Sequence, residues 1–274
     1  MKFVERLKRA WAASQSLLCV GLDPDPARLP KHLAGTAHPI FEFGRAIVDA
    51  TADLVCAFKP QIAYYAAARA EVELEMTIAH IRRQHPEIPV ILDAKRGDVG
   101  STAEMYAREA FERYQADAVT VNPYLGFDSL SPFLAHADKG VIVLCHTSNP
   151  GARDVQDIAS DGRKLYQIIA EKAARDWNAN GNVMLVVGAT YPEELGEIRA
   201  IVGDMPILVP GVGAQGGDVA AVVANGATAD GAGLIISTSR AVLYAGSGPD
   251  YAEAARSAAL KLRDEINFCR KAKR

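Results

Sequence analysis

The sequence has few cysteines, and their positions exclude the common cysteine-based sites. Four are present, Cys19, Cys56, Cys145 and Cys269, and none forms a CxxC pair. Three of them lie inside apolar, strand-like runs, which favours reduced thiols in a cytoplasmic protein over a disulfide framework. The six histidines lack a metal-ligand pattern such as HExxH, so the sequence does not indicate metal catalysis.

A long apolar run and an excess of basic residues are also absent. No stretch of about eighteen apolar residues occurs, which argues against a membrane-spanning helix. The N-terminal region has basic residues before an apolar patch, but Glu5 and the polar residues 14–16 interrupt any signal-peptide core, so we expect an amphipathic helix over about residues 3–15. The net charge is −3, which predicts no nucleic-acid partner. The expected partner is a small molecule or another protein.

What the sequence does contain is a regular alternation of strand-like and helix-like segments. Hydrophobic residues make up 49% of its 274 residues, enough for a large core. Short apolar runs rich in β-branched residues alternate with longer segments of helical period, as in βα units. The eight strand candidates are residues 17–23, 54–60, 88–95, 117–123, 140–147, 182–190, 206–211 and 233–239. This pattern predicts an α/β protein with one domain over residues 1–274, a parallel (β/α)₈ TIM barrel over about 17–267; a doubly wound open sheet is the alternative.

Polar and charged residues gather where the predicted strands end. Active sites of (β/α)₈ barrels lie at the C-terminal ends of the strands, so this distribution predicts the position of the site. The residues at these ends are Asp23, Lys59, Asp93 with Lys95, Asn122, Thr147 with Ser148, Thr190, the loop "PGVGAQGG" and Arg240.

The third strand runs into "DAKRGD", which holds Asp93, Lys95 and Asp98 within six residues. Residues i and i+2 of a strand share a face, so Asp93 and Lys95 are expected to point together into the barrel mouth. One interpretation is a structural salt bridge followed by a helix cap from Ser101 or Thr102. The other is a lysine whose position and charge are set by carboxylates, as a general acid requires.

The loop "VPGVGAQGG" (209–217) is the predicted phosphate site. Its glycines, among them Gly211, Gly213 and Gly216, allow backbone N–H groups to approach an anion before a helix begins. Arg240, just after the eighth strand, is placed to bind the same phosphate. The alternatives are a flexible turn without a ligand for the loop and a surface arginine for Arg240. The spacing does not match GxxxxGK[ST], so a nucleoside triphosphate P-loop is not supported.

Two further strand ends leave alternatives open. Lys59 is interpreted as a ligand contact, a partner of the carboxylates, a Schiff-base nucleophile or a lysine at the barrel rim. Asp23, in "GLDPDP", is either a ligand contact or a turn-forming aspartate.

Six segments together resemble one enzyme family. They are "GLDPD", "FKPQIAYY", "LDAKRGDVGSTAEMYA", "HTSNPGA", "PGVGAQGG" and "STSRAVLYA", spread from about residue 17 to residue 244. In this set the sequence closely resembles orotidine 5′-phosphate decarboxylases, in particular the longer bacterial form.

The resemblance implies a cofactor-independent decarboxylase that forms UMP in pyrimidine biosynthesis. By this likeness Lys95 delivers a proton to C6 of the pyrimidine, and Asp93 holds Lys95 and crowds the substrate carboxylate. Asp98 and Thr102 are implied to reach the active site of a partner subunit, which makes the protein an obligate homodimer with shared sites.

The remaining positions follow from the same likeness. Asp23 and Lys59 match ribose-contacting positions, and Ser148 matches a contact to the pyrimidine amide. Gln215 lies in the loop that closes over phosphate and base, and Arg240 matches the phosphate arginine. Alternatives on the same barrel are a Mg²⁺-dependent sugar-phosphate decarboxylase or hexulose-phosphate synthase, a Schiff-base aldolase, and a catalytically silent nucleotide-binding protein.

Overall fold

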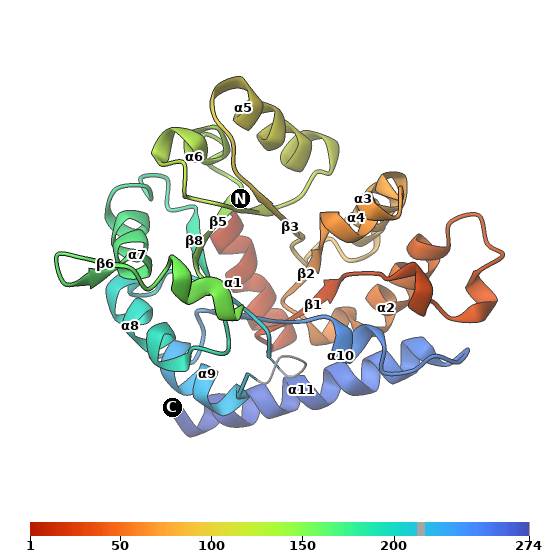
Figure 1. Cartoon of the computed structure of the whole chain (residues 1–274). Coiled ribbons are helices and arrows are strands. Elements are labelled where there is room, and N and C mark those ends of the chain that lie inside the picture. The colour runs from red at the N-terminus through yellow and green to blue at the C-terminus, as the bar shows by residue number, and fades with distance from the viewer. Residues whose placement is uncertain (213–216, 274) are drawn as a thin grey trace.

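Eight parallel strands, with helices outside them, form the centre of the molecule (Figure 1). The computed structural model describes residues 1–212 and 217–273. The strands are β1 (Leu18–Leu22), β2 (Ala57–Pro60), β3 (Ile91–Arg96), β4 (Ala118–Val121), β5 (Gly140–His146), β8 (Val183–Val187), β9 (Ile207–Pro210) and β10 (Leu234–Thr238). Seven of the eight predicted runs contain one of these strands, and β3 extends one residue beyond the end of its run, 88–95.

The order of the strands decides between the two predicted architectures. The sheet runs β2-β1-β10-β9-β8-β5-β4-β3, with each neighbouring pair parallel. Its two outer strands, β2 and β3, are joined by parallel bridges from Phe58 to Val90 and from Gln61 to Asp93. The sheet therefore closes on itself as a (β/α)₈ barrel, and the doubly wound alternative is wrong.

Helices follow the strands and cover the outside of the barrel (Figure 1). The helices are α1 (Phe3–Ser14), α2 (Pro39–Thr51), α3 (Ile62–Ala67), α4 (Glu71–Gln84), α5 (Gly100–Arg108), α6 (Phe127–Leu134), α7 (Leu165–Arg175), α8 (Pro192–Val202), α9 (Val219–Gly226), α10 (Arg240–Leu243) and α11 (Tyr251–Lys273). Short 3₁₀ turns span Pro26–Arg28, Lys31–Leu33, Ala52–Leu54 and Pro150–Asp154, and a π-helical turn spans Glu109–Arg113. A small hairpin of β6 (Ala159–Ser160) and β7 (Arg163–Lys164) lies before α7 and was not predicted.

Helix α1 is close to the prediction for residues 3–15, and it covers the N-terminal end of the barrel. Phe3, Leu7 and Trp11 follow one another at helical spacing and are buried. The Phe3 ring approaches Gly140 at the start of β5 so closely that a Cβ on residue 140 would lie 2.7 Å from it. With this end covered, the opposite, C-terminal end of the strands is left for a site.

The strands read as continuous apolar runs because both of their faces are covered. All residues of β1, β4, β8 and β10 are buried, one face toward the barrel interior and the other toward the helices. Over residues 1–212 and 217–273, no helix is both long and apolar enough to cross a bilayer.

The predicted cap of the helix after β3 is wrong. Helix α5 begins at Gly100, so Ser101 and Thr102 lie within its first turn, and the N-cap residue, Val99, makes no side-chain capping bond. Asp98 instead accepts a hydrogen bond from Val99 N at 2.8 Å through its Oδ1 atom. An N-cap side chain must precede the first helical turn, and the S-T-A-E sequence starts at Ser101, two residues after the N-cap position.

Candidate active site

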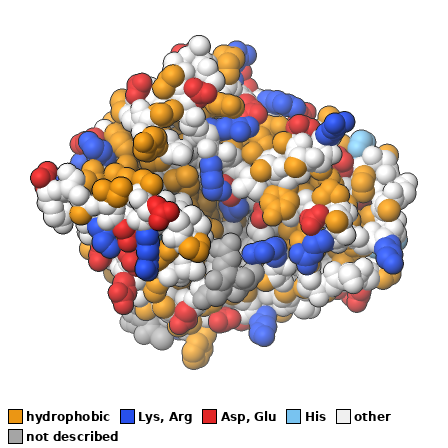
Figure 2. Space-filling view, viewed as in Figure 1, with side chains coloured by type: hydrophobic (Ala, Val, Ile, Leu, Met, Phe, Trp, Pro, Cys, Tyr) orange, Lys and Arg blue, Asp and Glu red, His pale blue; other side chains and the backbone are white. Residues whose placement is uncertain are grey.

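A cavity of about 550 Å³ opens at the C-terminal ends of the strands. Figure 2 shows this face of the molecule, where Lys and Arg side chains gather around the centre. The described residues that line the cavity are Asp23, Lys59, Tyr64, Asp93, Lys95, Thr147, Ser148, Asn149, Val186, Pro210, Gly211, Val212, Ser237, Thr238, Ser239 and Arg240. Most strand-end residues singled out in the sequence therefore surround one space. Asn122 and Thr190 do not line it. The Asn122 side chain accepts a hydrogen bond from Tyr124 N instead, and the Thr190 hydroxyl donates one to the Ser148 carbonyl oxygen.

A chain of charged groups crosses the floor of this cavity. Asp93 Oδ2 accepts a hydrogen bond from Lys59 Nζ at 2.8 Å, and Asp93 Oδ1 accepts one from Lys95 Nζ at 2.6 Å. Lys59 and Asp93 are almost fully buried, whereas the Lys95 side chain is 46% exposed. Lys95 therefore presents its ammonium group to the cavity while Asp93 anchors it from below.

Thr120, on the neighbouring strand β4, fixes the geometry of this group. Its hydroxyl donates to Asp93 Oδ1 at 2.9 Å and accepts from the backbone N–H groups of Ala94 and Lys95 at 3.0 and 2.9 Å. The pairing of β3 with β4 shifts register here, and Lys95 adopts a positive φ of 47°. Such a conformation is rare for a non-glycine residue and persists where the surroundings hold it, as the Thr120 contacts do here.

The charged chain shifts the ionisation of its buried members. Burial alone opposes the charge on Asp93, but Lys59 and Lys95 outweigh it and hold the pKa of Asp93 well below its usual range. Burial also opposes the charge on Lys59, but Asp93 and then Asp23 outweigh it and raise the pKa of Lys59. Asp93 is therefore an anion and Lys59 a cation at neutral pH.

Asp23, just after β1, offers the cavity an acceptor. Its Oδ1 atom is buried and has no hydrogen-bond partner among residues 1–212 and 217–273, and the same is true of the Thr238 hydroxyl at the end of β10. Both residues line the cavity. A buried polar atom without a partner is costly, so these two atoms are suited to bonding a polar group of a ligand.

Tyr244, which sequence reasoning did not single out, braces the loop that carries Asp23. Its hydroxyl accepts from Asp25 N at 2.6 Å and donates to the Asp23 carbonyl oxygen at 3.3 Å. The ring stacks on Phe43, and the Arg28 guanidinium lies 3.7 Å from its centroid. Tyr244 is the second-to-last residue of the segment "STSRAVLYA", so its place in that motif is a signal that could have identified it.

Ser148 lines the cavity from the loop after β5, and close packing holds that loop in place. The Thr147 N–H donates to Gln156 Oε1 at 2.8 Å, and Thr190 Oγ1 donates to the Ser148 carbonyl oxygen at 3.2 Å. A Cβ on Gly188 would lie 2.6 Å from Ser148 Cα, so only glycine allows this approach. Neither Gln156 nor Gly188 was predicted; the Gly188 contact arises only when β5 and β8 lie side by side, and the Gln156 contact depends on how the loop after β5 folds back on itself.

The predicted phosphate site is described in part. Gly211, with a φ of 97° that favours glycine, and Arg240, the first residue of α10, both line the cavity. Gly213, Gln215 and Gly216 lie outside the described residues.

Asp98 and Thr102 do not belong with the other predicted residues in this single chain. Neither is among the described residues that line the cavity, and Thr102 is exposed on α5. Around them, α5 and α6 pack together, and these helices and the residues just before them carry exposed apolar side chains. These are Val99, Met105, Tyr124, Leu125 and Phe127, which are 45–79% exposed and are called the α5–α6 apolar surface below.

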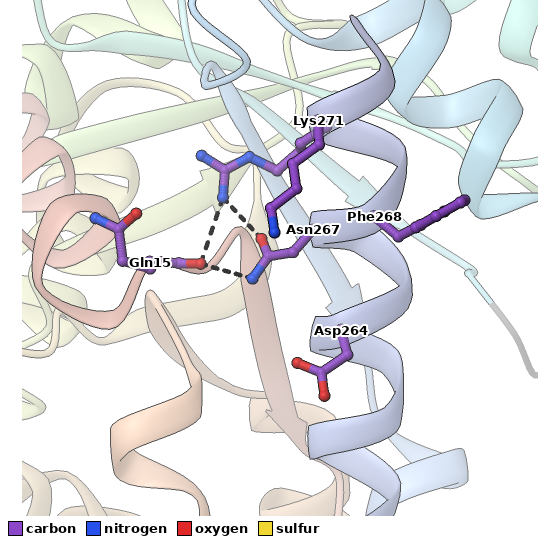
Figure 3. A pocket seen from close by; sticks show the side chains of 6 residues that line it. Gln15, Asp264, Asn267, Phe268 and Lys271 are labelled. Carbon is purple, nitrogen blue, oxygen red and sulfur yellow. Dashed lines mark hydrogen bonds between the residues drawn. The ribbon is translucent and has the colours of Figure 1, made fainter. Parts of the chain in front are cut away.

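A second hollow, of about 500 Å³, lies between the end of α1 and α11 (Figure 3). It is lined by Gln15, Asp264, Asn267, Phe268, Arg270 and Lys271. Asn267 and Arg270 donate to the Gln15 carbonyl oxygen and thereby tie α11 to the end of α1. It contains none of the strand-end residues, so the cavity at the barrel mouth is the candidate active site.

Comparison with known families and curated proteins gives one consistent result. Residues 16–258 match the family described as "Orotidine 5'-phosphate decarboxylase / HUMPS family". The orotidine 5'-phosphate decarboxylase of Ralstonia pickettii is 66% identical over 267 residues, which are 97% of this chain and 98% of that protein. The orotidine 5'-phosphate decarboxylase of Azoarcus sp. is 63% identical over 270 residues, covering 98% of this chain and all of that protein.

Solved structures agree with this result. The chain is similar to the OMP decarboxylase of Leishmania donovani, with a TM-score of 0.86, 40% sequence identity and coverage of 98% of this chain and 99% of that one. It also matches UMP synthase of the same organism, with a TM-score of 0.88 and 42% identity, over 98% of this chain and 57% of the longer protein.

Proposed function

The chain belongs to the orotidine 5′-phosphate decarboxylase / HUMPS family, and from this premise we propose that it converts orotidine 5′-phosphate into UMP and CO₂. The observation that carries the proposal is the Lys59–Asp93–Lys95 chain at the floor of the barrel-mouth cavity. The high identity to named decarboxylases over nearly the whole chain supports the choice of substrate.

The proposed reaction demands a positive charge and a proton at one place. Departure of CO₂ from C6 of the pyrimidine leaves a pair of electrons in the plane of the ring, where the ring π system cannot accept them. A cation held beside C6 stabilises that charge, and an N–H group there can then protonate it. Lys95 is proposed for both tasks, because its ammonium group is the one that projects from the charged chain into the cavity.

Asp93 has two proposed tasks. It keeps Lys95 charged and oriented through the 2.6 Å hydrogen bond. Its own negative charge also faces the position where the substrate carboxylate would lie, which disfavours the bound substrate relative to the transition state. Both tasks need Asp93 ionised, and the two lysines keep its pKa low.

Sugar and phosphate recognition is proposed for the other cavity walls. The unpartnered Asp23 Oδ1 is an acceptor for a ribose hydroxyl, with Lys59 beside it. Arg240 and Gly211 are proposed to bind the phosphate, and Ser148 to bind the pyrimidine amide. Phosphate binding far from C6 provides energy that can be used in the transition state.

We also propose that the active unit is a homodimer. Asp98 and Thr102 lie outside their own cavity, beside the α5–α6 apolar surface. Apolar surface of this kind is typical of protein interfaces, and a two-fold axis there would direct both residues toward the neighbouring cavity. A reducing compartment, the cytoplasm, suits the four free cysteines.

The Schiff-base alternative is less well supported. A Schiff-base lysine must attack as the neutral amine. Lys59 is buried against Asp93, which raises its pKa and keeps it charged, and Lys95 is also bonded to Asp93. Both lysines are therefore better suited to electrostatic and proton-donating roles.

The test is CO₂ release from orotidine 5′-phosphate, with UMP identified as the other product. We expect that EDTA does not reduce the activity. We also expect that borohydride traps no covalent adduct between the protein and its substrate. Loss of activity with EDTA and recovery with Mg²⁺ would favour a sugar-phosphate decarboxylase or synthase. Tight binding of UMP without turnover would favour a silent binding protein.

A further inference from the structure

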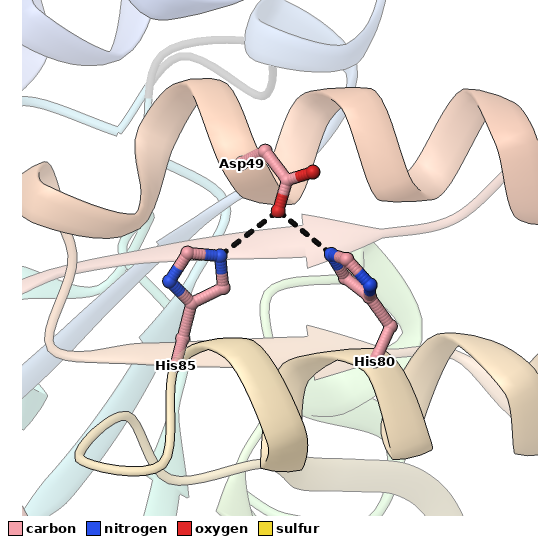
Figure 4. A group of neighbouring side chains, drawn as sticks. All are labelled: Asp49, His80 and His85. Carbon is pink, nitrogen blue, oxygen red and sulfur yellow. Dashed lines mark hydrogen bonds and ion pairs between the residues drawn. The ribbon is translucent and has the colours of Figure 1, made fainter.

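Three side chains of the kinds that bind metal ions lie together outside the barrel, away from the cavity. Asp49 on α2, His80 on α4 and His85 at the end of α4 each direct one ligand atom toward the others (Figure 4). His80 Nε2 lies 2.7 Å from Asp49 Oδ1, and His85 Nε2 lies 2.9 Å from the same oxygen. All three ligand atoms lie within 4.8 Å of one another. Within the described part of the chain, this is the one such group of three or more.

The fold holds both imidazoles in this arrangement. Helices α2 and α4 pack side by side, and the edge of the Phe41 ring from α2 meets the His80 ring at a centroid distance of 6.2 Å. The backbone N–H of His85 donates to the Ile81 carbonyl oxygen at 2.8 Å, which continues the backbone hydrogen-bond pattern of α4. The ligand atoms therefore converge because two rigid helices present them.

The surrounding charges favour a cation. The Asp49 carboxylate is 41% exposed and ionised, because the hydrogen bonds from His85 and His80 outweigh the opposing effect of burial and lower its pKa. The nearest cation on α2, Arg45, is paired with Glu42 at 2.7 Å, so its charge is already balanced. Among the six histidines of the sequence, only His80 and His85 share a carboxylate partner within the described residues.

We propose that Asp49, His80 and His85 bind a divalent transition-metal ion, with Zn²⁺ the best match. Two imidazole nitrogens and one carboxylate oxygen are a common Zn²⁺ ligand set, and water completes the fourth position at an exposed site. Mg²⁺ and Ca²⁺ prefer oxygen ligands, so the two histidines select against them.

Binding requires a small movement that this surface allows. Ligand atoms of a tetrahedral Zn²⁺ site lie roughly 3.3 Å apart, given bonds of about 2.0–2.1 Å. The Asp49 oxygen, now 2.7 and 2.9 Å from the two nitrogens, must withdraw by about half an ångström, and its exposed side chain is able to do so. The two imidazole nitrogens, which lie within 4.8 Å of each other, must reach the same separation of roughly 3.3 Å. A neutral imidazole with its proton on Nε2 moves that proton to Nδ1, and a protonated imidazole releases one proton.

The ion would tie α2 to the end of α4, and its effect is on stability. None of the three residues lines the barrel-mouth cavity, so decarboxylation is not expected to depend on the metal. A ligand that binds only the folded state stabilises it according to its concentration and affinity.

The test is calorimetric titration of the tag-free, metal-stripped protein with ZnCl₂, together with thermal unfolding. We expect one Zn²⁺ per chain and, at about a hundredfold excess over the dissociation constant, a rise in Tm of about 5 °C. The variants His85→Gln and Asp49→Asn should each lose at least about tenfold in Zn²⁺ affinity. MgCl₂ should produce neither binding heat nor a shift in Tm.

His38→Gln is the matched control, because His38 is an exposed histidine next to the same helix, α2, and belongs to no such group. It should bind Zn²⁺ as the unmodified protein does. The proposal is overturned if the unmodified protein does not bind Zn²⁺, or if His85→Gln and Asp49→Asn both bind it with unchanged affinity. Far-UV circular dichroism establishes that each variant is folded.

Discussion

At the scale of single residues, Asp93 has the most demanding surroundings in the molecule. It is 7% exposed and accepts hydrogen bonds from two lysines and from Thr120. Removing one partner of a buried ion pair leaves the other charge uncompensated, which costs more than the pair itself contributes. The same residue therefore supports both the fold and the proposed chemistry.

Asp93→Asn should reduce the free energy of unfolding by about 3 kcal/mol at pH 7, because it leaves the Lys59 charge buried without an anion. The variant should also lose less of its free energy of unfolding than the unmodified protein as the pH falls. The pKa of Asp93 is lower in the folded state, so its contribution is complete above the usual aspartate value of about 3.9 and is lost as the pH falls below that. Urea unfolding at pH 5 and pH 3 is the measurement. The prediction is contradicted if the unmodified protein and Asp93→Asn lose the same free energy of unfolding between pH 5 and pH 3.

Lys95→Ala should abolish the proposed decarboxylation while leaving the fold and UMP binding largely intact. The Lys95 side chain is 46% exposed, so its removal leaves no large void. We expect kcat to fall by at least about 10³-fold, since both the proton donor and the charge beside C6 are lost. CO₂ release is the measurement, and Lys8→Ala on the exposed side of α1 is the control. A kcat within tenfold of the unmodified value would remove Lys95 from the proposed role.

At the scale of elements, the loops at the strand ends are positioned by residues distant in sequence. Tyr244 follows α10 and holds the loop after β1, and Thr120 on β4 holds the end of β3. Such contacts connect strands that are neighbours in the barrel but far apart along the chain. The accuracy of the site thus depends on the register of the sheet.

Tyr244→Phe should raise the KM for orotidine 5′-phosphate by up to about tenfold with a smaller change in kcat, because the hydroxyl's two hydrogen bonds, from Asp25 N and to the Asp23 carbonyl oxygen, are lost. Tyr251→Phe is a close control. Tyr251 stacks on the same Phe43 ring, but its hydroxyl contacts the Glu42 carbonyl oxygen rather than the β1 loop. Steady-state kinetics of both variants provide the measurement, and equal effects would show that the Tyr244 hydroxyl does not position Asp23.

At the scale of the whole molecule, the position of Asp98 is the main question. Within one chain its side chain bonds to Val99 N and does not line the cavity, although family resemblance gives it a role at the site. A shared site in a dimer reconciles these observations. The α5–α6 apolar surface beside it provides a surface on which a second copy would pack.

Mixing subunits tests the shared site directly. Lys95→Ala and Asp98→Ala proteins, each inactive, should regain about a quarter of the unmodified activity when their subunits exchange at equal amounts, because each hybrid dimer contains one intact site. CO₂ release after mixing is the measurement. Continued inactivity, with subunit exchange demonstrated by mass spectrometry, would indicate a site built within one chain.

Phe127→Asp should dissociate the proposed dimer by placing a charge in its apolar interface. Sedimentation should then report monomers, and activity should fall and depend on protein concentration. Phe268→Asp is the control, since Phe268 is an exposed phenylalanine on α11, away from the α5–α6 apolar surface. If both variants sediment alike, the interface lies elsewhere or does not form.

The sequence by itself determined the eight strands, the N-terminal helix and the strand ends at which the site lies. These are local properties, because hydrophobic period and turn residues report on burial over a few neighbouring positions. The closed barrel followed from the number and alternation of the elements, although only the bridges between β2 and β3 excluded the open sheet.

Only the tertiary structure decided which strand-end residues meet. The sequence predicted that Asp93 and Lys95 point together, but it left alternatives open for Lys59; the tertiary structure brought Lys59 to the second oxygen of Asp93, placed Thr120 and Tyr244 as supports, and left Asn122, Thr190, Asp98 and Thr102 out of the cavity. It also brought Asp49 to His80 and His85, which no local spacing in the sequence predicts. The physical reason is that side-chain contacts between strands or helices depend on register and packing angle, and these are set by the whole core rather than by any one segment.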